Sequence, residues 1–284
     1  MRRPKSVLGM FLLVGVIFLL VIGLMSLLLP LFGYGEDPEP EPITEAEPIV
    51  EEPSYTLPGV FSVAEGWKRY NHEGFEALRG VDVSSHQGAV DWQALRRDGA
   101  QFAMLRAGYR GYTDGGLFED PLFRSNAEAA ASEGIALGVY FFSQAITVEE
   151  AEAEARFVLE LLEGLDITWP IAFDWEPVEA EARTDNLSGR DMTACALAFC
   201  QVIREAGYTP AIYTNQAQSR LYYGYAAEEL ADIHIWLADY QDTPEFDHTF
   251  HMWQYTDAGT LAGVDVPIDL NLSFVDYASE RTTR

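Results

Sequence analysis

The chain has 284 residues, a formal net charge of −27 and an apolar share of 48%. This length accommodates one α/β barrel of about 200 to 250 residues together with a terminal segment. The acidity argues against nucleic acid as a partner, because phosphates need Lys and Arg to neutralise them. It also argues against docking of the folded domain onto an anionic lipid surface, and is typical of a soluble, self-repelling surface.

The N-terminus has the pattern of a membrane anchor. Residues 7–32 carry no charged side chain, and about 20 apolar residues span a bilayer core as a helix. Basic residues precede this run and acidic ones follow it, which predicts that the chain after about residue 33 lies outside the cell. A cleaved signal peptide is the alternative, although its apolar region is usually only about 7–15 residues long. We expect residues 1–34 to be a cytoplasmic stub and a single-pass anchor.

Residues 35–58 have the composition of a linker, with eight acidic residues and six prolines. Such a segment buries too little apolar surface to fold, and proline and like charges keep it extended. Residues 59–79 form an N-terminal extension that either caps the bottom of the following domain or joins it to the linker. The folded domain is expected over residues 80–284.

Within this domain, short apolar runs alternate with amphipathic stretches, which is typical of an α/β fold with a parallel sheet. Eight strands are predicted, at 80–83, 102–107, 135–142, 170–175, 210–214, 233–238, 250–255 and 266–271. Helices are predicted at 91–98, 121–133, 148–164, 189–206 and 216–222. Eight strands favour a barrel, and the short connections in the last third make it an irregular one.

The chain has two cysteines, Cys195 and Cys200, and both lie in a predicted helix. Five residues along a helix separate their Cα atoms by roughly 8–9 Å, whereas a disulfide needs less than about 7 Å. We therefore expect two buried free thiols.

Four acids lie at or near the ends of predicted strands, where working residues of such barrels are found. They are Asp82, Asp174, Glu176 and Asp269. Each lies among apolar residues, and a buried charge is expensive unless it has a role or a partner. Asp174 and Glu176 are alternate residues of one strand, about 6.6 Å apart along it, so both should face the same side.

Paired carboxyls of this kind match glycoside hydrolysis, which needs one acid to protonate the leaving oxygen and one carboxylate to stabilise positive charge. Neighbouring negative charges raise at least one pKa and so retain a proton near neutral pH. Aromatic rings near strand ends could stack on sugar rings or simply fill the barrel. The candidates for substrate binding are Tyr109, Tyr140, Tyr213, Trp236, Tyr240 and Trp253, with Tyr140 and Trp253 favoured. We expect His86 and His251 to be structural.

The motifs, in their order and spacing, resemble those of the family 25 glycoside hydrolases, the CH-type lysozymes. The resemblance runs from about residue 79 to residue 274. It is carried by GVDVS at 80–84, FAMLRAG at 102–108, GVYFF at 138–142, DWE at 174–176, AIYT at 211–214, IWLADY at 235–240, MWQY at 252–255 and IDLN at 268–271.

The resemblance implies an irregular (β/α)5(β)3 barrel that cleaves the β-1,4 bond between N-acetylmuramic acid and N-acetylglucosamine in peptidoglycan. Glu176 would be the general acid, and Asp174 would orient the substrate's acetamido group for attack on the anomeric carbon. Asp82 and Asp269 would maintain the charge and hydrogen-bond pattern. Simple inversion stays open as the alternative mechanism. Trp175, between the two acids, departs from the smaller residue that is commoner there, and its side chain should face away from the site.

These features predict a monomeric enzyme on the outer face of a bacterial membrane, with a peptidoglycan strand as partner and neither cofactor nor metal. A chitinase-like function is disfavoured, because Trp169 and Ala172 stand where further aspartates would be needed. A catalytically silent glycan-binding module is disfavoured by the presence of all four acids. A metal-dependent hydrolase is disfavoured by the lack of a histidine-rich ligand set.

Overall fold

The computed structural model describes residues 60–72 and 74–281. The predicted anchor and linker lie outside these residues. Within them, no helix is both long enough and apolar enough to cross a bilayer.

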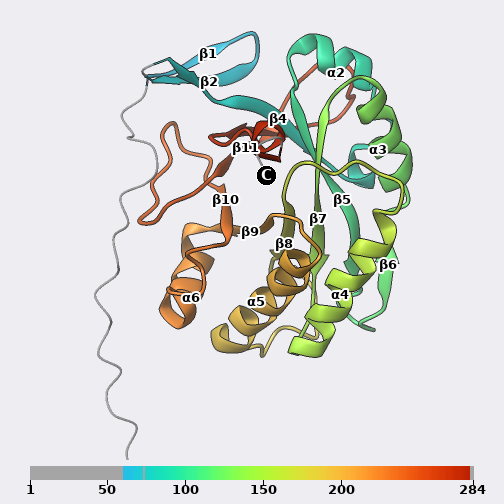
Figure 1. Cartoon of the computed structure of the whole chain (residues 1–284), viewed down its shortest axis with the longest axis vertical. Coiled ribbons are helices and arrows are strands. Elements are labelled where there is room, and N and C mark those ends of the chain that lie inside the picture. The colour runs from blue at the N-terminus through green and yellow to red at the C-terminus, as the bar shows by residue number, and fades with distance from the viewer. Residues whose placement is uncertain (1–59, 73, 282–284) are drawn as a thin grey trace, which may run out of the picture. The chain divides into compact units, whose positions relative to one another are not determined.

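Eight strands close into a barrel (Figure 1). They are β4 (Leu78–Val83), β5 (Phe102–Arg110), β7 (Ala136–Ser143), β8 (Ile171–Trp175), β9 (Pro210–Asn215), β10 (His234–Ala238), β11 (Met252–Gly259) and β12 (Ile268–Ser273). Each pairs with the next in this order, and β12 pairs with β4 to complete the ring. All eight predicted strands are therefore present, with ends that differ by a few residues.

The expectation of a parallel sheet is correct for seven strands and wrong for the last. The seven barrel strands from β4 to β11 run parallel to one another, whereas β12 is antiparallel to both β11 and β4. Only residues 260–267 join β11 to β12. A parallel crossover needs about a dozen residues or more, so this short connection turns the chain back on itself.

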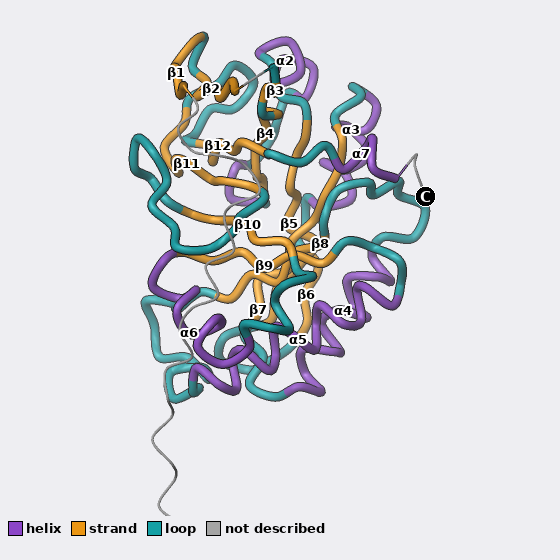
Figure 2. Tube along the Cα trace, turned by 60° about the vertical axis from the view of Figure 1, so that its left-hand side comes forward, coloured by secondary structure: helices purple, strands orange, loops and turns teal. Residues whose placement is uncertain are grey.

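Helices follow the first five barrel strands and cover the outside of the sheet (Figures 1 and 2). They are α2 (Trp92–Asp98), α3 (Phe123–Ser132), α4 (Val148–Leu161), α5 (Gly189–Glu205) and α6 (Gln216–Ala226). Short elements η2 (Ser85–Gln87), β6 (Leu117–Glu119) and α7 (Tyr277–Arg281) complete this part of the chain. The five predicted helices are thus confirmed, and β6, which pairs with β5, was not predicted.

Side-chain oxygens begin four of these helices. Asp91, Thr147, Ser188 and Asn215 each accept a backbone N–H from the first turn of α2, α4, α5 and α6. Such caps satisfy N–H groups that have no partner inside the helix and typically stabilise it by about 1 kcal/mol. They fix the residue at which each of these four helices begins.

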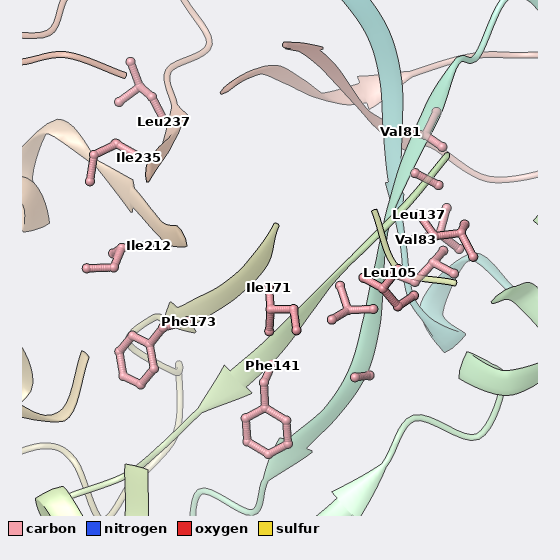
Figure 3. Close-up of a cluster of buried hydrophobic side chains, with 14 of the residues drawn as sticks. Val81, Val83, Leu105, Leu137, Phe141, Ile171, Phe173, Ile212, Ile235 and Leu237 are labelled. Carbon is pink, nitrogen blue, oxygen red and sulfur yellow. The ribbon is translucent and has the colours of Figure 1, made fainter. Parts of the chain in front are cut away.

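Two apolar clusters lie on opposite faces of the barrel wall. The larger fills the space between the strands and the helices, and Figure 3 shows part of it. Its members include Val81, Val83, Leu105, Leu137, Phe141, Ile171, Phe173, Ile212, Ile235 and Leu237. The second cluster includes Phe102, Met104, Trp169, Trp236, Met252 and Tyr277. Since strand residues alternate between faces, this second set points into the barrel. It fills the half of the barrel in which most of the parallel strands begin.

The extension before the barrel forms a three-stranded antiparallel sheet of β1 (Val60–Ala64), β2 (Trp67–His72) and β3 (Phe75–Glu76). Trp67 and Tyr70 are fully buried in the main apolar cluster. The Trp67 indole N–H donates to the backbone oxygen of Asp98, 2.8 Å away at the end of α2. The extension therefore belongs to the same compact unit as the barrel.

The two cysteines lie in α5, and both are buried and free. The prediction of two thiols without a bridge is confirmed. Burial raises the pKa of Cys195 and of Cys200 to about 12, which keeps both protonated and unreactive at neutral pH.

Candidate active site

The structure brings the four predicted acids together at one end of the barrel. Asp82 lies near the end of β4, Asp174 near the end of β8, and Glu176 immediately after β8. Asp269 is the second residue of β12, and because β12 runs in the opposite direction, its beginning lies at the same end. The outward neighbours of these acids, such as Val83 and Phe173, belong to the apolar cluster under the helices, so the acids face the interior.

Asp82 and Asp269 form a hydrogen-bonded pair across two neighbouring strands. The strand register places the two residues opposite each other, and their side chains share a hydrogen bond. Asp82 Oδ2 also accepts amide N–H groups from Asn271 at 2.7 Å and from Gln254 at 3.0 Å. Burial and the Asp82 charge raise the pKa of Asp269 to about 9, so Asp269 holds a proton at neutral pH.

The pKa values of Asp174 and Glu176 are both raised. Burial, the charge of Glu176 and the charge of Asp82 raise the pKa of Asp174 well above its usual value, and Arg106 opposes this shift. Burial and then the charge of Asp82 raise the pKa of Glu176. At neutral pH the pair therefore retains a proton that can be given to another group.

One oxygen of this pair has no partner within the described structure. Asp174 is 4% exposed, and its Oδ1 atom is buried without a hydrogen bond. A buried acceptor without a donor costs about 1–3 kcal/mol, and such atoms in native structures call for an explanation, such as a functional role. A donor brought by a ligand would satisfy Oδ1.

Three of the predicted aromatic residues surround the acids. Tyr140 on β7 and Tyr213 on β9 point into the barrel. Burial raises the pKa of both phenols, and the charges of nearby carboxyls, Asp82 and Asp174 among them, raise it further. Tyr240 follows β10 and is 52% exposed. The Tyr213 and Tyr240 hydroxyls donate to Gln254 Oε1 at 2.9 and 2.8 Å. These three phenols therefore lie near the acids, where the predicted sugar contacts would be.

Two other aromatic predictions do not fit the structure as direct contacts. Trp253 is fully buried on the outer face of β11, against Phe61, and donates its N–H to the Asp239 backbone oxygen at 2.6 Å. Trp236 faces inward but is 1% exposed, below Tyr140 and Tyr213. For both, burial leaves no ring surface for a sugar, and the predicted contact is wrong.

Tyr109 is half-buried and stacks on Phe118 of β6, with ring centroids 5.4 Å apart. The β5–β6 hairpin, which the sequence pattern did not reveal, therefore covers one face of this ring. The Arg106 guanidinium lies 5.6 Å from its centroid. Tyr109 is thus held at the edge of the barrel and separate from the hydrogen bonds that join the acids.

Sequence reasoning missed several polar residues of the site. Gln254, Asn271 and Arg106 all lie within the family-like motifs but were given no role. Arg106 is fixed by Asp120, with nitrogen–oxygen distances of 2.7 and 2.8 Å, and by Ser85 at 3.0 Å. The only available signal was their position in inward-facing register with the acids, because their partners come from other strands.

The residues next to the acids have structural roles. Gln144 Nε2 donates to the backbone oxygen of Glu176 at 3.0 Å, and Gln218 Nε2 donates to that of Trp175 at 3.1 Å. Trp175 packs against the outer apolar cluster, as expected for a side chain facing away from the site.

His251 accepts a backbone N–H from Ile235, and burial lowers its pKa to about 3, so it is structural and neutral.

Comparison with known proteins shows one consistent family. The model for "Glycosyl hydrolases family 25" matches residues 81–264, a range that includes Asp82, Asp174 and Glu176 and ends before Asp269. The autolytic lysozyme of Clostridium acetobutylicum is 23% identical over 195 residues, covering 68% of this chain and 55% of that protein. Lysozyme M1 of Streptomyces globisporus is 26% identical over 203 residues, covering 68% of this chain and 67% of that protein.

Solved structures show the same fold. The modular autolysin LytC of Streptococcus pneumoniae, in complex with a synthetic peptidoglycan ligand, superposes with a TM-score of 0.60 at 22% identity. The match covers 75% of this chain and 52% of that one. The chain thus spans about half the length of the autolysin and of the clostridial lysozyme.

Proposed function

This chain belongs to family 25 of the glycosyl hydrolases and is therefore a glycoside hydrolase, and from this membership we propose that it is an N-acetylmuramidase. Its reaction is hydrolysis of the β-1,4 bond between N-acetylmuramic acid and N-acetylglucosamine in peptidoglycan. Support comes from the lysozymes among its relatives and from the peptidoglycan ligand bound by a protein of the same fold.

The unpartnered Oδ1 atom of Asp174 is the observation that carries the proposed mechanism. An N-acetylmuramic acid residue brings an acetamido N–H, which is a donor of the kind that this buried acceptor lacks. A hydrogen bond from that N–H favours the ionised form of Asp174 and turns the acetamido oxygen toward the anomeric carbon. Attack by this oxygen forms a bond to the anomeric carbon as the glycosidic bond breaks, and it stabilises the positive charge that develops in the transition state. Water then adds to the anomeric carbon and breaks the bond to the acetamido oxygen, which completes the hydrolysis.

Glu176 is the general acid in this proposal. Its raised pKa keeps a proton available at neutral pH, and the hydrogen bond from Gln144 to its backbone oxygen fixes the start of the loop that carries it. It protonates the glycosidic oxygen as the bond to the anomeric carbon breaks. Asp82 supplies a negative charge near Asp174 and Glu176. In the hydrogen bond between Asp82 and Asp269, Asp269 carries the proton.

We also propose that the domain works outside the cytoplasmic membrane, because peptidoglycan lies there. Residues 1–34 would anchor the protein and residues 35–58 would act as a spacer, as their composition predicts. Recovery of the full-length chain from the membrane fraction supports the anchor. A secreted chain that starts after about residue 34 supports a cleaved signal peptide instead.

Glu176→Gln tests the assignment of the acid. The amide keeps the shape of the side chain but holds no transferable proton, so we expect the rate of peptidoglycan cleavage to fall by a factor of about 100 or more. The midpoint of thermal unfolding should stay nearly unchanged. Mass spectrometry of the fragments released from purified peptidoglycan identifies the bond, because a muramidase leaves N-acetylmuramic acid at the reducing end.

Glu179→Gln is the matched control, since Glu179 is exposed and lies in the same loop. It should cleave at the rate of the unsubstituted protein. Full activity in Glu176→Gln would refute the role of Glu176. N-acetylglucosamine at the reducing end would refute the muramidase, and binding without any cleavage by the unsubstituted protein would refute turnover altogether.

A further inference from the structure

Two consecutive hydrogen bonds connect Trp236, in the inward-facing apolar cluster, to Asp82. The Trp236 indole N–H donates to Asn271 Oδ1 at 2.8 Å, and Asn271 Nδ2 donates to Asp82 Oδ2 at 2.7 Å. Trp236 is 1% exposed and Asn271 is fully buried. No water can replace these contacts without displacing packed side chains, so the two hydrogen bonds are a fixed part of the interior.

The donor character of the indole determines the direction of both hydrogen bonds. An indole nitrogen can donate but cannot accept, so the Asn271 atom facing it must be the oxygen. The other end of the amide, which faces Asp82, must then be its NH₂ group. Asp82 Oδ2 therefore accepts from Asn271 and cannot itself carry the proton.

Gln254 supports the same arrangement from the neighbouring strand. Its Oε1 atom accepts from the Tyr213 and Tyr240 hydroxyls, which leaves its NH₂ group to donate to Asp82 Oδ2 at 3.0 Å. Two amide donors thus converge on one carboxylate oxygen, and hydrogen bonds to a charged form favour that form. Burial raises the pKa of Asp82, and the hydrogen bonds from Gln254, Asn271 and Asp269 oppose this shift. Because these donors favour the charged form of Asp82, Asp269 is the donor in the hydrogen bond between the two carboxyls.

We propose that Trp236 and Asn271 form a positioning pair that holds Asp82 as the anion and Asp269 as the protonated acid of their shared hydrogen bond. This proposal rests on the proposed function for its catalytic consequence, because the Asp82 charge adds to burial in keeping Glu176 protonated. Neither Trp236 nor Asn271 touches the substrate in this scheme. Both act through the charge state of Asp82.

The charge of Asp82 acts on groups from several strands. The groups that share this interior are Asp174 and Glu176 at the end of β8, Asp269 on β12, Tyr140 on β7, Tyr213 on β9, Tyr240 after β10 and Arg106 on β5. Of these, Arg106 is the cation, and it is already paired with Asp120. The positioning pair can therefore change the charge of Asp82 without altering the ion pair of Arg106 and Asp120.

Trp236→Phe removes the indole N–H while keeping an aromatic ring in the inward-facing apolar cluster. Asn271 can then rotate and present its oxygen to Asp82, which stabilises the protonated form of Asp82. Its ionisation moves to higher pH, so the acidic limb of the kcat/KM profile moves upward. With less negative charge nearby, the pKa of Glu176 falls, so the alkaline limb moves downward. We expect the profile to narrow by about one pH unit in total, the scale of a neighbouring charge.

Trp169→Phe is the matched control. Trp169 lies in the same inward-facing apolar cluster and is 2% exposed, but its N–H has no hydrogen-bond partner among residues 60–72 and 74–281. The substitution makes a similar packing change without touching the hydrogen bonds that lead to Asp82, so the pH profile should keep its width. Equal narrowing in both variants, or unchanged width in Trp236→Phe, would overturn the proposal.

A titration that needs no substrate separates this inference from the proposed function. In protein labelled with ¹³C at the aspartate carboxyls, Asp82 should titrate at higher pH in Trp236→Phe than in Trp169→Phe. Asp82→Asn identifies the resonance. If the unsubstituted enzyme fails to cleave peptidoglycan but this difference is present, the proposed function fails and the positioning pair stands. If cleavage occurs and Asp82 titrates alike in both variants, the positioning pair fails alone.

Discussion

Asp174 combines an unfavourable environment with a central position in the site, and this combination leads to a prediction at the scale of one residue. In Asp174→Asn the side chain keeps its shape but loses the charge that would orient the acetamido group. We expect kcat on peptidoglycan to fall by a factor of about 10² to 10³, which corresponds to about 2.7–4 kcal/mol of lost transition-state stabilisation. Steady-state kinetics measure it, and Asp166→Asn, at an exposed position before β8, should leave kcat unchanged.

Asp174→Asn should raise the stability of the folded protein at neutral pH although it lowers the activity. Burial raises the pKa of Asp174, so the folded state binds this proton more tightly than the unfolded state does. The stability contributed by that proton is full below about pH 4, the unfolded pKa of aspartate, and is lost as the pH rises. The unfolding midpoint of Asp174→Asn should therefore exceed that of the unsubstituted protein at pH 7 and approach it at pH 4. An equal or lower midpoint at pH 7 would contradict this.

At the residue scale, the sequence revealed charged groups better than their partners. The four acids stood out because aspartate and glutamate are rare within apolar strands. Asn271 and Gln254 did not, since amides are common near strand ends and their roles depend on which residue lies opposite. The error on Trp253 has a simple cause: its inward neighbour Gln254 implies that Trp253 faces outward, so one step along the strand decides between a sugar contact and a packed ring.

At the scale of elements, a buried ion pair fastens α4 to β5. Arg110 at the end of β5 donates to Glu154 in α4 at 2.6 Å, and both side chains are almost completely buried. Ser143 adds a second hydrogen bond to Glu154, also at 2.6 Å. Arg110→Leu would leave the carboxyl buried without its cation, which typically costs about 3–5 kcal/mol. We expect a clearly lower midpoint of chemical denaturation.

Arg156→Leu provides the comparison on the same helix. Arg156 pairs with Glu152 on the exposed face of α4, and exposed ion pairs contribute only about 0–1 kcal/mol. Its denaturation midpoint should stay close to that of the unsubstituted protein. Similar losses in both variants would mean that burial of the Arg110–Glu154 pair adds nothing to stability.

The elements themselves were largely predictable, because apolar periodicity and capping residues are local signals. The eight barrel strands and helices α2 to α6 follow from them. The direction of β12 could not be predicted from its own residues, because a strand pattern is the same in both directions. Only the short connection of residues 260–267 determines how the chain returns. Strand β6 is only three residues long, too short for alternation to indicate it.

At the scale of the whole folded unit, the extension of β1 to β3 is part of the barrel's support. It matches no motif, since its partners lie far along the chain: Phe61 contacts Trp253, and the Lys68 ammonium lies 4.5 Å from the centre of the Trp253 indole ring system. The backbone N–H of Lys68 donates to the Tyr255 hydroxyl at 3.1 Å. These contacts hold the outer face of β11, the strand whose inner face carries Gln254.

Trp67→Ala tests this support. Trp67 is fully buried and hydrogen-bonded to the end of α2, and removal of a buried tryptophan typically costs about 3–5 kcal/mol. If the extension and the barrel fold as one unit, the loss appears as a single unfolding transition at lower denaturant concentration, with activity lost in the same transition. Val63→Ala, at a residue 75% exposed in β1, should shift the midpoint little. An early, separate transition that leaves activity intact would show that the extension unfolds without the barrel, and hence that the site does not depend on it.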